Sequence, residues 1–331
     1  MKLEEKIMIR AASVGLGWWG KTLANSIQDS NKINVVMATT RTLNNIEEYC
    51  KEINAEVASS YDDIVKSDKV DAVILATPHS KHLEQIVAAV NNDKHVFVEK
   101  PITLTAEDAK IAYDEAKKNN KILAVGFNRR FHPNFMKIVD MIQSNELGKV
   151  LHIEGTINAP GLWMYKPESW RSNAAETPAG GMTGMGIHII DQMIASNGHI
   201  SSAYAQTAKV VKKGELDEIT SVLFKFANGS TGYLGTSIAS SVFYNFRVIA
   251  ENGTIEIIER DLSVIKYTPR EGEITTTTNS DVDMCKNELE AFADAINQVA
   301  PYPVTSEQGI HGAAVFEAVI NSAEKEALIS I

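Results

Sequence analysis

The sequence is poor in cysteine, in basic charge and in long apolar runs. Its two cysteines, Cys50 and Cys285, lie far apart and form no metal or redox motif, so a reducing cytoplasm is the simplest compartment. The net charge of −10 and the pI near 5.4 mean that phosphates would be repelled overall. These shortages argue against nucleic acid and anionic membranes as partners, and we expect no bound metal.

No apolar stretch is long enough to span a bilayer, and residues 1–6 contain no apolar region of the signal-peptide kind. We therefore expect neither a leader nor a membrane anchor. No internal repeat is visible, and the only low-complexity segment is the threonine run 275–278. The length of 331 residues suggests two domains, and 44% hydrophobic with 22% charged residues is typical of a globular protein.

The most informative stretch is Gly15-Leu16-Gly17-Trp18-Trp19-Gly20, which follows the strand-length apolar run 7–14 and precedes apolar residues at helical spacing. In this context Gly-x-Gly-x-x-Gly is typical of the phosphate-binding turn of a dinucleotide fold. The first glycine allows the tight turn, the second lets the pyrophosphate approach and the third lets the helix pack closely. The helix N-terminus adds free N–H groups and a positive dipole end. We expect all six residues to bind a dinucleotide rather than to form a purely structural turn.

Strands and helices alternate through the rest of the first half. Further strands are expected at 33–39, 70–77, 95–99 and 122–127, with helices at 43–54, 61–65, 82–91 and 106–119. This alternation predicts an α/β domain with a doubly wound parallel sheet and ligands at the carboxyl ends of its strands. We place this Rossmann domain at residues 1–126 and an α+β domain for substrate binding and oligomerisation at residues 127–331.

The end of the second strand bears on the choice of cofactor. NAD-binding folds usually carry an acidic residue there for the ribose 2′-hydroxyl, whereas this chain has Thr39-Thr40-Arg41-Thr42. Arg41 can pair with a 2′-phosphate, or it can be a solvated loop residue that stacks on the adenine. We favour NADP over NAD, with Thr40 and Arg41 as cofactor-binding residues.

Glu99-Lys100-Pro101 follows another expected strand. A lysine at this place can reach the active-site crevice, where its ammonium can hydrogen-bond a substrate hydroxyl and stabilise charge that develops on the oxygen. The proline fixes the backbone there, and a cis bond is one way to do so. The alternative is a surface Lys–Glu pair, and the position after this fold pattern argues against it.

These motifs, together with Ala76-Thr77-Pro78 and His82, resemble the glucose–fructose oxidoreductase/inositol dehydrogenase (Gfo/Idh/MocA) family. The likeness continues through residues 126–133, which include Asn128 and Arg129, and covers essentially the whole chain. It implies a Rossmann domain followed by an open, mostly antiparallel sheet. It also implies NAD(P)-dependent oxidation or reduction of sugars, polyols or related carbonyl compounds, with Lys100 between nicotinamide and substrate. The cofactor contacts that it implies in the first half are Ala76, Thr77, Pro78, His82, Glu99, Lys100 and Asn128.

Residues 159–179 have weak periodicity and many turn formers. Their aromatic rings suit the faces of sugars, but they could equally fill the domain interface, and loops often carry function. Trp170-Arg171 resembles a recurring pair in the family, which implies that Arg171 helps to position cofactor or substrate. The residues that we expect to bind substrate are Lys100, Arg129, Trp163, Tyr165, Met185 and His188.

Residues 180–191 form the second catalytic candidate, a helix start crowded with glycine. Each glycine costs about 1 kcal/mol relative to alanine, so the crowding suggests close approach of the backbone to a ring such as nicotinamide or substrate. A histidine in an apolar stretch is often only packed, but the resemblance favours His188 as the proton shuttle.

The sequence departs from the family at Gly184. Polyol dehydrogenases of the family commonly carry an aspartate four residues before the histidine, on the same helix face. No carboxylate can be assigned at Gly184, and Asp191 is interpreted as mainly structural. Either the substrate is not an inositol-like polyol, or Lys100 and His188 suffice.

After residue 202 the pattern is a series of strands with turns such as Asn228-Gly229, a strong hairpin signal, and two helices end the chain. This pattern predicts a meandering antiparallel sheet, with one face over the active site and the other free to pair subunits in a homodimer or homotetramer.

The sequence therefore predicts a cytoplasmic NAD(P)-dependent oxidoreductase that acts on a sugar, a sugar derivative or a related hydroxyl compound. A catalytically inactive NAD(P)-binding sensor remains open because of Gly184. An enzyme that uses bound NAD transiently, without net redox change, also remains open.

Overall fold

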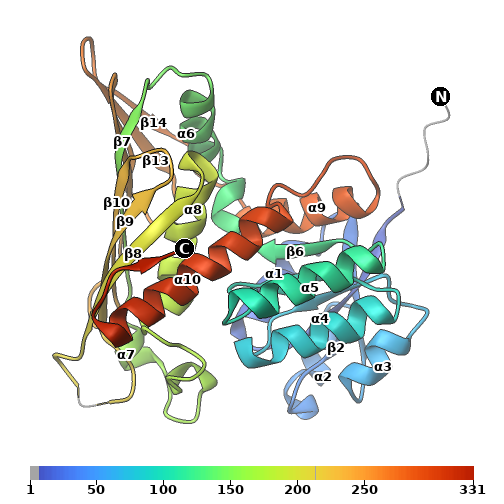
Figure 1. The fold of residues 1–331 in the computed structure, drawn as a ribbon. Coiled ribbons are helices and arrows are strands. Elements are labelled where there is room, and N and C mark those ends of the chain that lie inside the picture. The colour runs from blue at the N-terminus through green and yellow to red at the C-terminus, as the bar shows by residue number, and fades with distance from the viewer. Residues whose placement is uncertain (1–6, 213) are drawn as a thin grey trace, which may run out of the picture. The chain divides into compact units, whose positions relative to one another are not determined.

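The computed structural model describes residues 7–212 and 214–331, so the expectations for residues 1–6 lie outside the described residues. The chain divides by its internal contacts into two units (Figure 1). Unit 1 comprises Met1–Thr103, Glu107–Asn128 and Asp283–Gly309, and unit 2 comprises Leu104–Ala106, Arg129–Val282 and Ile310–Ile331. The domain boundary expected after residue 126 stays a prediction, and one late segment groups with unit 1.

Unit 1 is built on a six-stranded sheet in the order β3-β2-β1-β4-β5-β6, and every neighbouring pair is parallel. All four residues of β4 are buried, as expected for a parallel strand that helices cover on both faces. The expected parallel sheet is confirmed. Its strands are β1 (Ile9–Val14), β2 (Ile33–Thr39), β3 (Glu56–Val57), β4 (Ala72–Leu75), β5 (His95–Glu99) and β6 (Leu123–Gly126).

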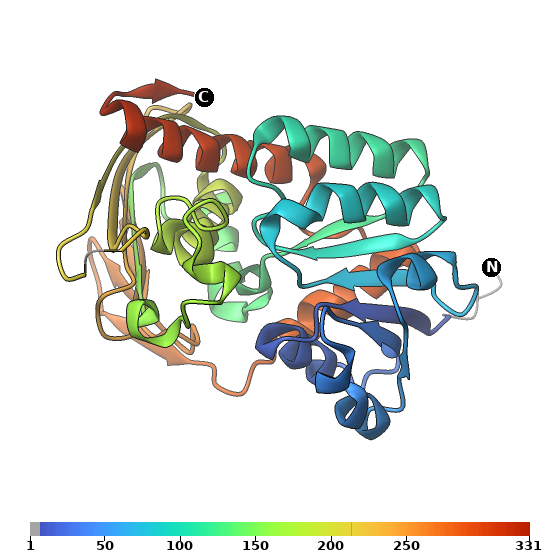
Figure 2. The same ribbon diagram turned by 90° about the horizontal axis from the view of Figure 1, so that it is seen from below.

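Helices cover both faces of this sheet. Figure 2 shows α4 and α5 (teal) on one side of the strands and α1 (dark blue) on the other. The late helix α9 packs near α1 and places Phe292 5.9 Å from Phe97 of β5, between ring centroids. The elements are α1 (Trp18–Ser26), η1 (Leu43–Asn45), α2 (Glu47–Glu52), α3 (Tyr61–Lys66), η2 (His79–Lys81), α4 (His82–Asn91), α5 (Ala106–Lys118) and α9 (Met284–Ile296).

The single helix expected over 43–54 is instead divided into η1 and α2. The backbone between them leaves helical geometry at Ile46, where φ is −121°. Asn44 and Asn45 precede the break, and asparagine weakens helices because its side chain competes for backbone hydrogen bonds.

Unit 2 is built on a nine-stranded sheet in the order β14-β13-β12-β11-β7-β10-β9-β8-β15. Within the described strands of this sheet only the β7–β10 pair is parallel, so the mostly antiparallel sheet is confirmed. The expected hairpin lies between β9 and β10, where Gly229 adopts φ +95°. The strands are β7 (Val150–Asn158), β8 (Ile200–Ala208), β9 (Ile219–Phe226), β10 (Thr231–Ser237), β11 (Phe243–Ala250), β12 (Gly253–Ile257), β13 (Val264–Pro269), β14 (Thr275–Thr278) and β15 (Ile329–Ser330).

One face of this sheet is covered by helices. Ile189 of α8 packs directly on Gly155 of β7, where a Cβ at residue 155 would clash with the Ile189 side chain. The backbone N–H of Ala205 in β8 donates to Ser322 Oγ of α10 at 2.8 Å. The helical elements are η3 (Asn128–Phe131), α6 (Pro133–Gln143), α7 (Gly161–Met164), η4 (Trp170–Ser172), η5 (Met182–Gly186), α8 (Ile187–Asn197) and α10 (Ser306–Lys325).

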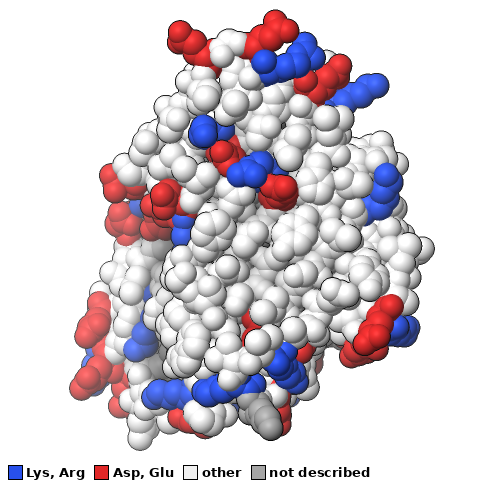
Figure 3. Space-filling view, turned by 90° about the vertical axis from the view of Figure 1, so that its left-hand side faces the viewer, with Lys and Arg blue, Asp and Glu red and all other residues white. Residues whose placement is uncertain are grey.

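The opposite face of the nine-stranded sheet carries exposed apolar side chains and also a cluster of ion pairs, in which Arg247 of β11 contacts Glu154 of β7 and Glu256 of β12. Leu223 and Phe243 are 57% and 50% exposed, and Tyr233 of β10 pairs with Leu223 across the ladder. Figure 3 views the molecule from this side and shows few charged residues near the centre. No helix among residues 7–212 and 214–331 is both long and apolar enough to cross a membrane.

Candidate active site

The glycine turn connects β1 to α1, and backbone hydrogen bonds fix its path. The N–H of Gly15 donates to the carbonyl of Thr39 at 2.9 Å, and the N–H of Gly17 donates to the carbonyl of Gly15 at 2.9 Å. Helix α1 begins at Trp18 with no side-chain cap and no acidic residue in its first turn. The first-turn N–H groups and the positive helix end can therefore interact with an anion.

The three glycines of the turn have different roles. At Gly15, where φ is +91°, a Cβ would lie 2.6 Å from the carbonyl oxygen of Ala76. At Gly20 a Cβ would collide with the carbonyl oxygen of Gly15. At Gly17 a Cβ would meet nothing within 4 Å. Two glycines are thus needed by the chain itself, whereas Gly17 leaves open space at the helix N-terminus, where the motif leads us to expect the pyrophosphate.

The other residues of the turn differ in exposure. Leu16 is only 4% exposed, whereas Trp18 is 77% exposed. The rings of Trp18 and Trp19 lie 5.3 Å apart, and the buried Nε1 of Trp19 has no hydrogen-bond partner in the described part of the chain. Trp18 therefore offers an open aromatic face beside the turn, while Leu16 packs inside.

The end of β2 carries no carboxylate. Thr40 is half-buried, and Arg41 is exposed and forms no ion pair with any residue that the structure describes. Thr39 donates its hydroxyl to the carbonyl of Ala58 at 2.9 Å and is thereby committed to the fold. Arg41 is consequently the available cation at this strand end.

His82 joins the ends of β4 and β5. Its Nδ1 lies 3.0 Å from the carbonyl oxygen of Pro101, and its Nε2 lies 3.2 Å from that of Thr77. The ring is fully buried, and the Lys100–Pro101 peptide is cis, as the sequence suggested. His82 thus fixes the two loops that bear Thr77 and Lys100, and its expected cofactor contact stays a prediction.

The carboxyl ends of β5 and β6 meet at Glu99. Glu99 is 7% exposed, and a Cβ at Gly126 would lie 2.9 Å from its Oε1. Asn128 donates its side-chain N–H to the thiol of Cys285 at 3.7 Å, and burial raises the pKa of that thiol. Lys100 follows Glu99 directly and is half-buried. Unit 1 therefore gathers the glycine turn, the Thr77 loop and Lys100 along the carboxyl edge of its sheet.

In unit 2, the glycine-rich segment is a π-helical turn, η5, that leads into α8, and π-helical turns frequently occur at functional sites. Gly180 lies against the backbone of Asp217, and a Cβ at Gly181 or Gly186 would lie 3.1 or 3.0 Å from the side chain of Thr236. These three glycines thus serve packing within the unit. The expected approach of this backbone to a ligand ring stays a prediction.

Gly184 leaves space on the turn before His188. The nearest atom to a Cβ at Gly184 would be the hydroxyl of Tyr165, at 4.0 Å. Burial raises the pKa of Tyr165, so this hydroxyl keeps its proton near neutral pH. His188 lies in the first turn of α8 and is 9% exposed. The Tyr165 hydroxyl thus lies next to Gly184, the position at which the sequence provides no carboxylate.

The loop residues expected to bind substrate vary in burial. Trp163 is 57% exposed, whereas Met185 is 8% exposed. The guanidinium of Arg171 lies 4.2 Å from the ring centroid of Trp170, so the expected pair stacks. Contrary to the irregular loop that we expected, the segment contains α7 and η4.

The buried ion pair of unit 2 joins η3 to α8. Arg130 donates to both oxygens of Asp191, at 2.7 Å from Nη2 and 2.8 Å from Nε. Burial raises the pKa of Asp191, and the guanidinium opposes that shift. The bidentate geometry engages the carboxylate fully, which agrees with the structural role expected for Asp191.

Sequence reasoning missed three further residues around α8, which are Gln192, Tyr244 and Arg130. Arg129, itself expected at the substrate, lies with its guanidinium carbon 4.6 Å from the ring centroid of Tyr244, and the Tyr244 hydroxyl donates to Gln192 Oε1 at 2.9 Å. Gln192 follows His188 by four residues, and this helical spacing is the signal that could have revealed it. Tyr244 and Arg130 had no such local signal, because β11 and η3 are far from α8 in sequence.

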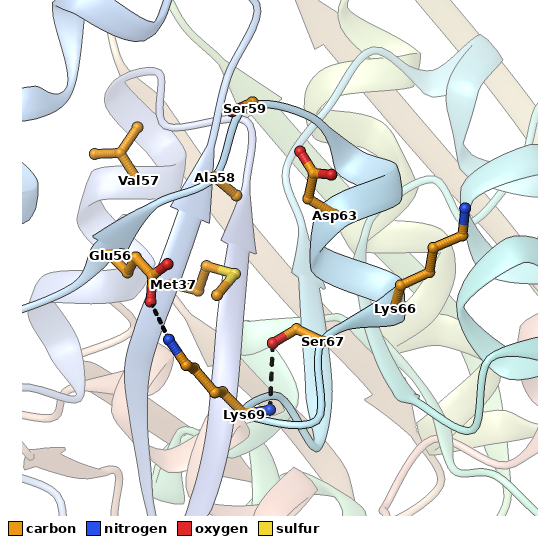
Figure 4. Close-up of a pocket in the computed structure, with 9 residues that line it drawn as sticks. All are labelled: Met37, Glu56, Val57, Ala58, Ser59, Asp63, Lys66, Ser67 and Lys69. Atoms are coloured by element: carbon orange, nitrogen blue, oxygen red, sulfur yellow. Dashed lines mark hydrogen bonds and ion pairs between the residues drawn. The ribbon is translucent and has the colours of Figure 1, made fainter.

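A surface pocket lies away from the expected site residues, and the described residues form no metal site. No group of three or more His, Cys, Asp or Glu side chains in the described residues could hold a metal. A surface pocket of about 400 Å³ lies beside β3 and α3 (Figure 4), and none of the expected site residues lines it. Two of its charged groups pair with each other, with Lys69 2.7 Å from Glu56. The pocket therefore does not compete with the carboxyl edge of the sheet.

Comparison with known proteins agrees with this geometry. Residues 9–127 match the model of the Gfo/Idh/MocA oxidoreductase family, NAD-binding Rossmann fold, and residues 135–256 match that family's C-terminal domain. An uncharacterized oxidoreductase of Streptococcus pneumoniae is 29% identical, over 67% of this chain and 60% of that protein. The scyllo-inositol 2-dehydrogenase (NADP(+)) IolW of Bacillus subtilis is 26% identical, over 98% of this chain and 96% of that protein. Levoglucosan dehydrogenase in complex with NADH and levoglucosan shares the fold, with a TM-score of 0.89 at 20% identity over 98% of this chain and 100% of that one.

Proposed function

Because the chain belongs to the Gfo/Idh/MocA family of NAD(P)-dependent oxidoreductases, we propose that it interconverts a hydroxyl and a carbonyl group on a sugar, a sugar derivative or a related compound. The observation that carries the proposal is the open space at Gly17 beside the N-terminus of α1. The names of two relatives, a scyllo-inositol dehydrogenase and a levoglucosan dehydrogenase, support the substrate class.

NADP is the cofactor that we favour. The end of β2 lacks an acid, and Arg41 is exposed without an ionic partner in the described chain, which suits a 2′-phosphate. The nicotinamide, when bound, would accept or supply the hydride. Gly15, Gly17 and Gly20 with the first turn of α1 would hold the pyrophosphate.

The residues proposed for the reaction are Lys100 and His188. Lys100 would orient and polarise the reacting oxygen through its ammonium, and His188 would hydrogen-bond the same oxygen or exchange its proton. The position of Lys100 is supported by the tie that His82 makes between Thr77 and Pro101. Substrate contacts are proposed for Arg129, Trp163, Tyr165 and Met185, with Trp170 and Arg171 at the cofactor.

A second candidate function is a dinucleotide-binding sensor without catalysis. The observation that favours it is Gly184, which supplies no carboxylate beside His188. A sensor would bind dinucleotide tightly and turn over no substrate.

Assembly and location complete the proposal. The outer face of the nine-stranded sheet, with Leu223 and Phe243 exposed, would bury apolar area in a homodimer or homotetramer (Figure 3). Both cysteines are buried and free, which suits the cytoplasm.

The test is a fluorescence titration of the purified protein with NADPH and NADH, followed by a panel of sugars and polyols at saturating NADP or NAD. The oxidoreductase predicts tight binding together with turnover of one substrate class. Tight binding without turnover across the panel would favour the sensor. Absence of binding by either dinucleotide would contradict both functions.

A further inference from the structure

Gln192 is a wholly buried amide on α8, one helical turn after His188. Its exposure is 0%, and its Nε2 has no hydrogen-bond partner in the described part of the chain. A buried amide N–H without a partner destabilises the folded state, so such a group needs an explanation. Residues four apart on a helix lie on one face, so Gln192 and His188 are neighbours.

The orientation of the Gln192 amide follows from the two residues beneath it. Arg129 carries only donors and lies over the Tyr244 ring, 4.6 Å from its centroid. Burial raises the pKa of Tyr244, so its hydroxyl stays protonated and donates to Gln192 Oε1 at 2.9 Å. With the oxygen held by Tyr244, the Nε2 end of the amide is the end left for another acceptor.

We propose that Gln192 is a positioning residue for His188, donating from Nε2 to His188 Nδ1 and so holding the imidazole neutral with its proton on Nε2. Rotation of the ring about its Cβ–Cγ bond, a soft torsion in histidine, brings Nδ1 toward the amide. An imidazolium would carry a proton on Nδ1 and would face a donor, so Gln192 opposes protonation of His188.

The other charged and titratable groups around α8 leave this role to Gln192. Asp191 on the same helix is engaged by Arg130. Other groups near these elements of unit 2 include Arg129 from η3, Tyr244 from β11, Tyr165 from the segment after α7, Arg171 from η4 and Arg260 after β12, and Arg129 and Tyr244 already contact each other. The carboxylate of Asp191 apart, none of these side chains bears a negative charge near neutral pH.

The proposal deepens the proposed function and rests on it only for the oxygen that His188 meets. A neutral ring with hydrogen on Nε2 acts on that oxygen as a hydrogen-bond donor. Proton exchange with the substrate oxygen is then assigned to Lys100, which gives a proton to that oxygen as an ammonium in reduction and takes the hydroxyl proton as a neutral amine in oxidation. This division of roles explains how the site can work without a carboxylate at Gly184.

The test is NMR of the full-length protein with 15N-labelled histidine, in which the 15N shifts report the tautomer and the pKa of each ring. His188→Asn identifies the His188 signals among the eight histidines. Gln192→Glu keeps an acceptor for Tyr244 but replaces the amide donor with a carboxylate. Gln206→Glu on the exposed side of β8 is the matched control for the added charge.

In the wild type we expect His188 to show the Nε2–H tautomer at pH 7.5. Gln192→Glu should switch the ring to Nδ1–H and raise its pKa by about one unit or more, because an opposite charge nearby favours imidazolium. Gln206→Glu should change neither. If Gln192→Glu does not fold, Gln192→Met should still weaken the tautomer preference.

A wild-type His188 in the Nδ1–H form, or shifts that do not respond to Gln192→Glu or Gln192→Met, would overturn the proposal. The readout needs no substrate and no turnover. Failure of the substrate panel would therefore count against the proposed function, and failure of the NMR test would count against Gln192.

Discussion

The imidazole of His82 lies 3.0 Å through Nδ1 from the carbonyl oxygen of Pro101, and through Nε2 it lies 3.2 Å from that of Thr77. One buried ring thus sets the distance between two strand ends of the Rossmann sheet. Lys100 directly precedes Pro101, so we expect its backbone position to depend on this tie.

We expect His82→Leu to lower the free energy of unfolding by about 1–3 kcal/mol, because a buried carbonyl group loses the ring N–H as its partner. Turnover should fall by a larger factor than dinucleotide affinity, since the glycine turn is untouched. Urea denaturation, kcat and a dinucleotide titration measure the three quantities. Unchanged stability together with unchanged kcat would show that the tie has no role.

Gly15→Ala and Gly17→Ala form a matched pair. A Cβ at Gly15 would lie 2.6 Å from the Ala76 carbonyl at φ +91°, so we expect Gly15→Ala to destabilise the protein by more than about 1 kcal/mol. A Cβ at Gly17 meets nothing within 4 Å, so Gly17→Ala should melt like the wild type and yet bind NADPH at least tenfold more weakly.

Thermal melts and NADPH titrations of both variants give the answer. Equal loss of stability in the two variants would mean that Gly17 also serves the fold. If Gly17→Ala binds NADPH with full affinity, the pyrophosphate does not occupy the space beside Gly17.

Much of unit 1 could be predicted from sequence because its signals are local. The glycine turn, the apolar strands and the Glu99-Lys100-Pro101 motif each act within a few residues. Helix α9 was expected as the end of the second domain, and only the structure shows it grouping with unit 1. Sequence periodicity gives a helix its apolar face but not the sheet on which that face packs.

The site in unit 2 was harder to predict for the same physical reason. His188 stood out as a titratable group in a glycine-rich stretch, but its neighbours Tyr244 and Arg130 come from distant elements. The π-helical turn also escaped prediction, since glycine crowding indicated close approach without saying which atoms approach. The Thr236 side chain and the Asp217 backbone occupy most of the space next to these glycines.

Arg41→Ala should weaken NADPH binding about 10- to 100-fold and leave NADH binding unchanged. The reason is the loss of charge-assisted hydrogen bonds to a 2′-phosphate, worth about 1.5–3 kcal/mol. Parallel titrations of wild type, Arg41→Ala and Arg41→Lys check it, with the lysine variant expected between the two. If Arg41→Ala leaves the ratio of the NADPH and NADH affinities unchanged, Arg41 is a solvated loop residue and does not bind the 2′-phosphate.

His95 should make stability depend on pH. Burial, with Lys121 nearby, lowers its pKa to about 4, and the N–H of Ile122 donates to its Nδ1 at 3.0 Å. Between pH about 6.5 and about 4 the unfolded chain binds a proton at this site and the folded chain does not. This contribution is therefore complete above pH about 6.5 and is lost as the pH falls toward 4.

We expect His95→Asn, which keeps an acceptor for Ile122 and cannot titrate, to lose about 2 kcal/mol less stability than the wild type between pH 7.5 and pH 4.5. Urea denaturation at several pH values measures the difference. If the free energy of unfolding falls equally with pH in the wild type and in His95→Asn, His95 is not held neutral in the folded state.

The most direct test of the central claim is Lys100→Ala, examined for both turnover and NADPH binding. The account predicts loss of turnover by a factor of about 1,000 or more, because the reacting oxygen loses its cationic partner, while the dissociation constant for NADPH changes less than about threefold. Lys100→Arg is the control that keeps the charge and changes the geometry. Near-normal turnover in Lys100→Ala would contradict the assignment of Lys100 to the reaction centre.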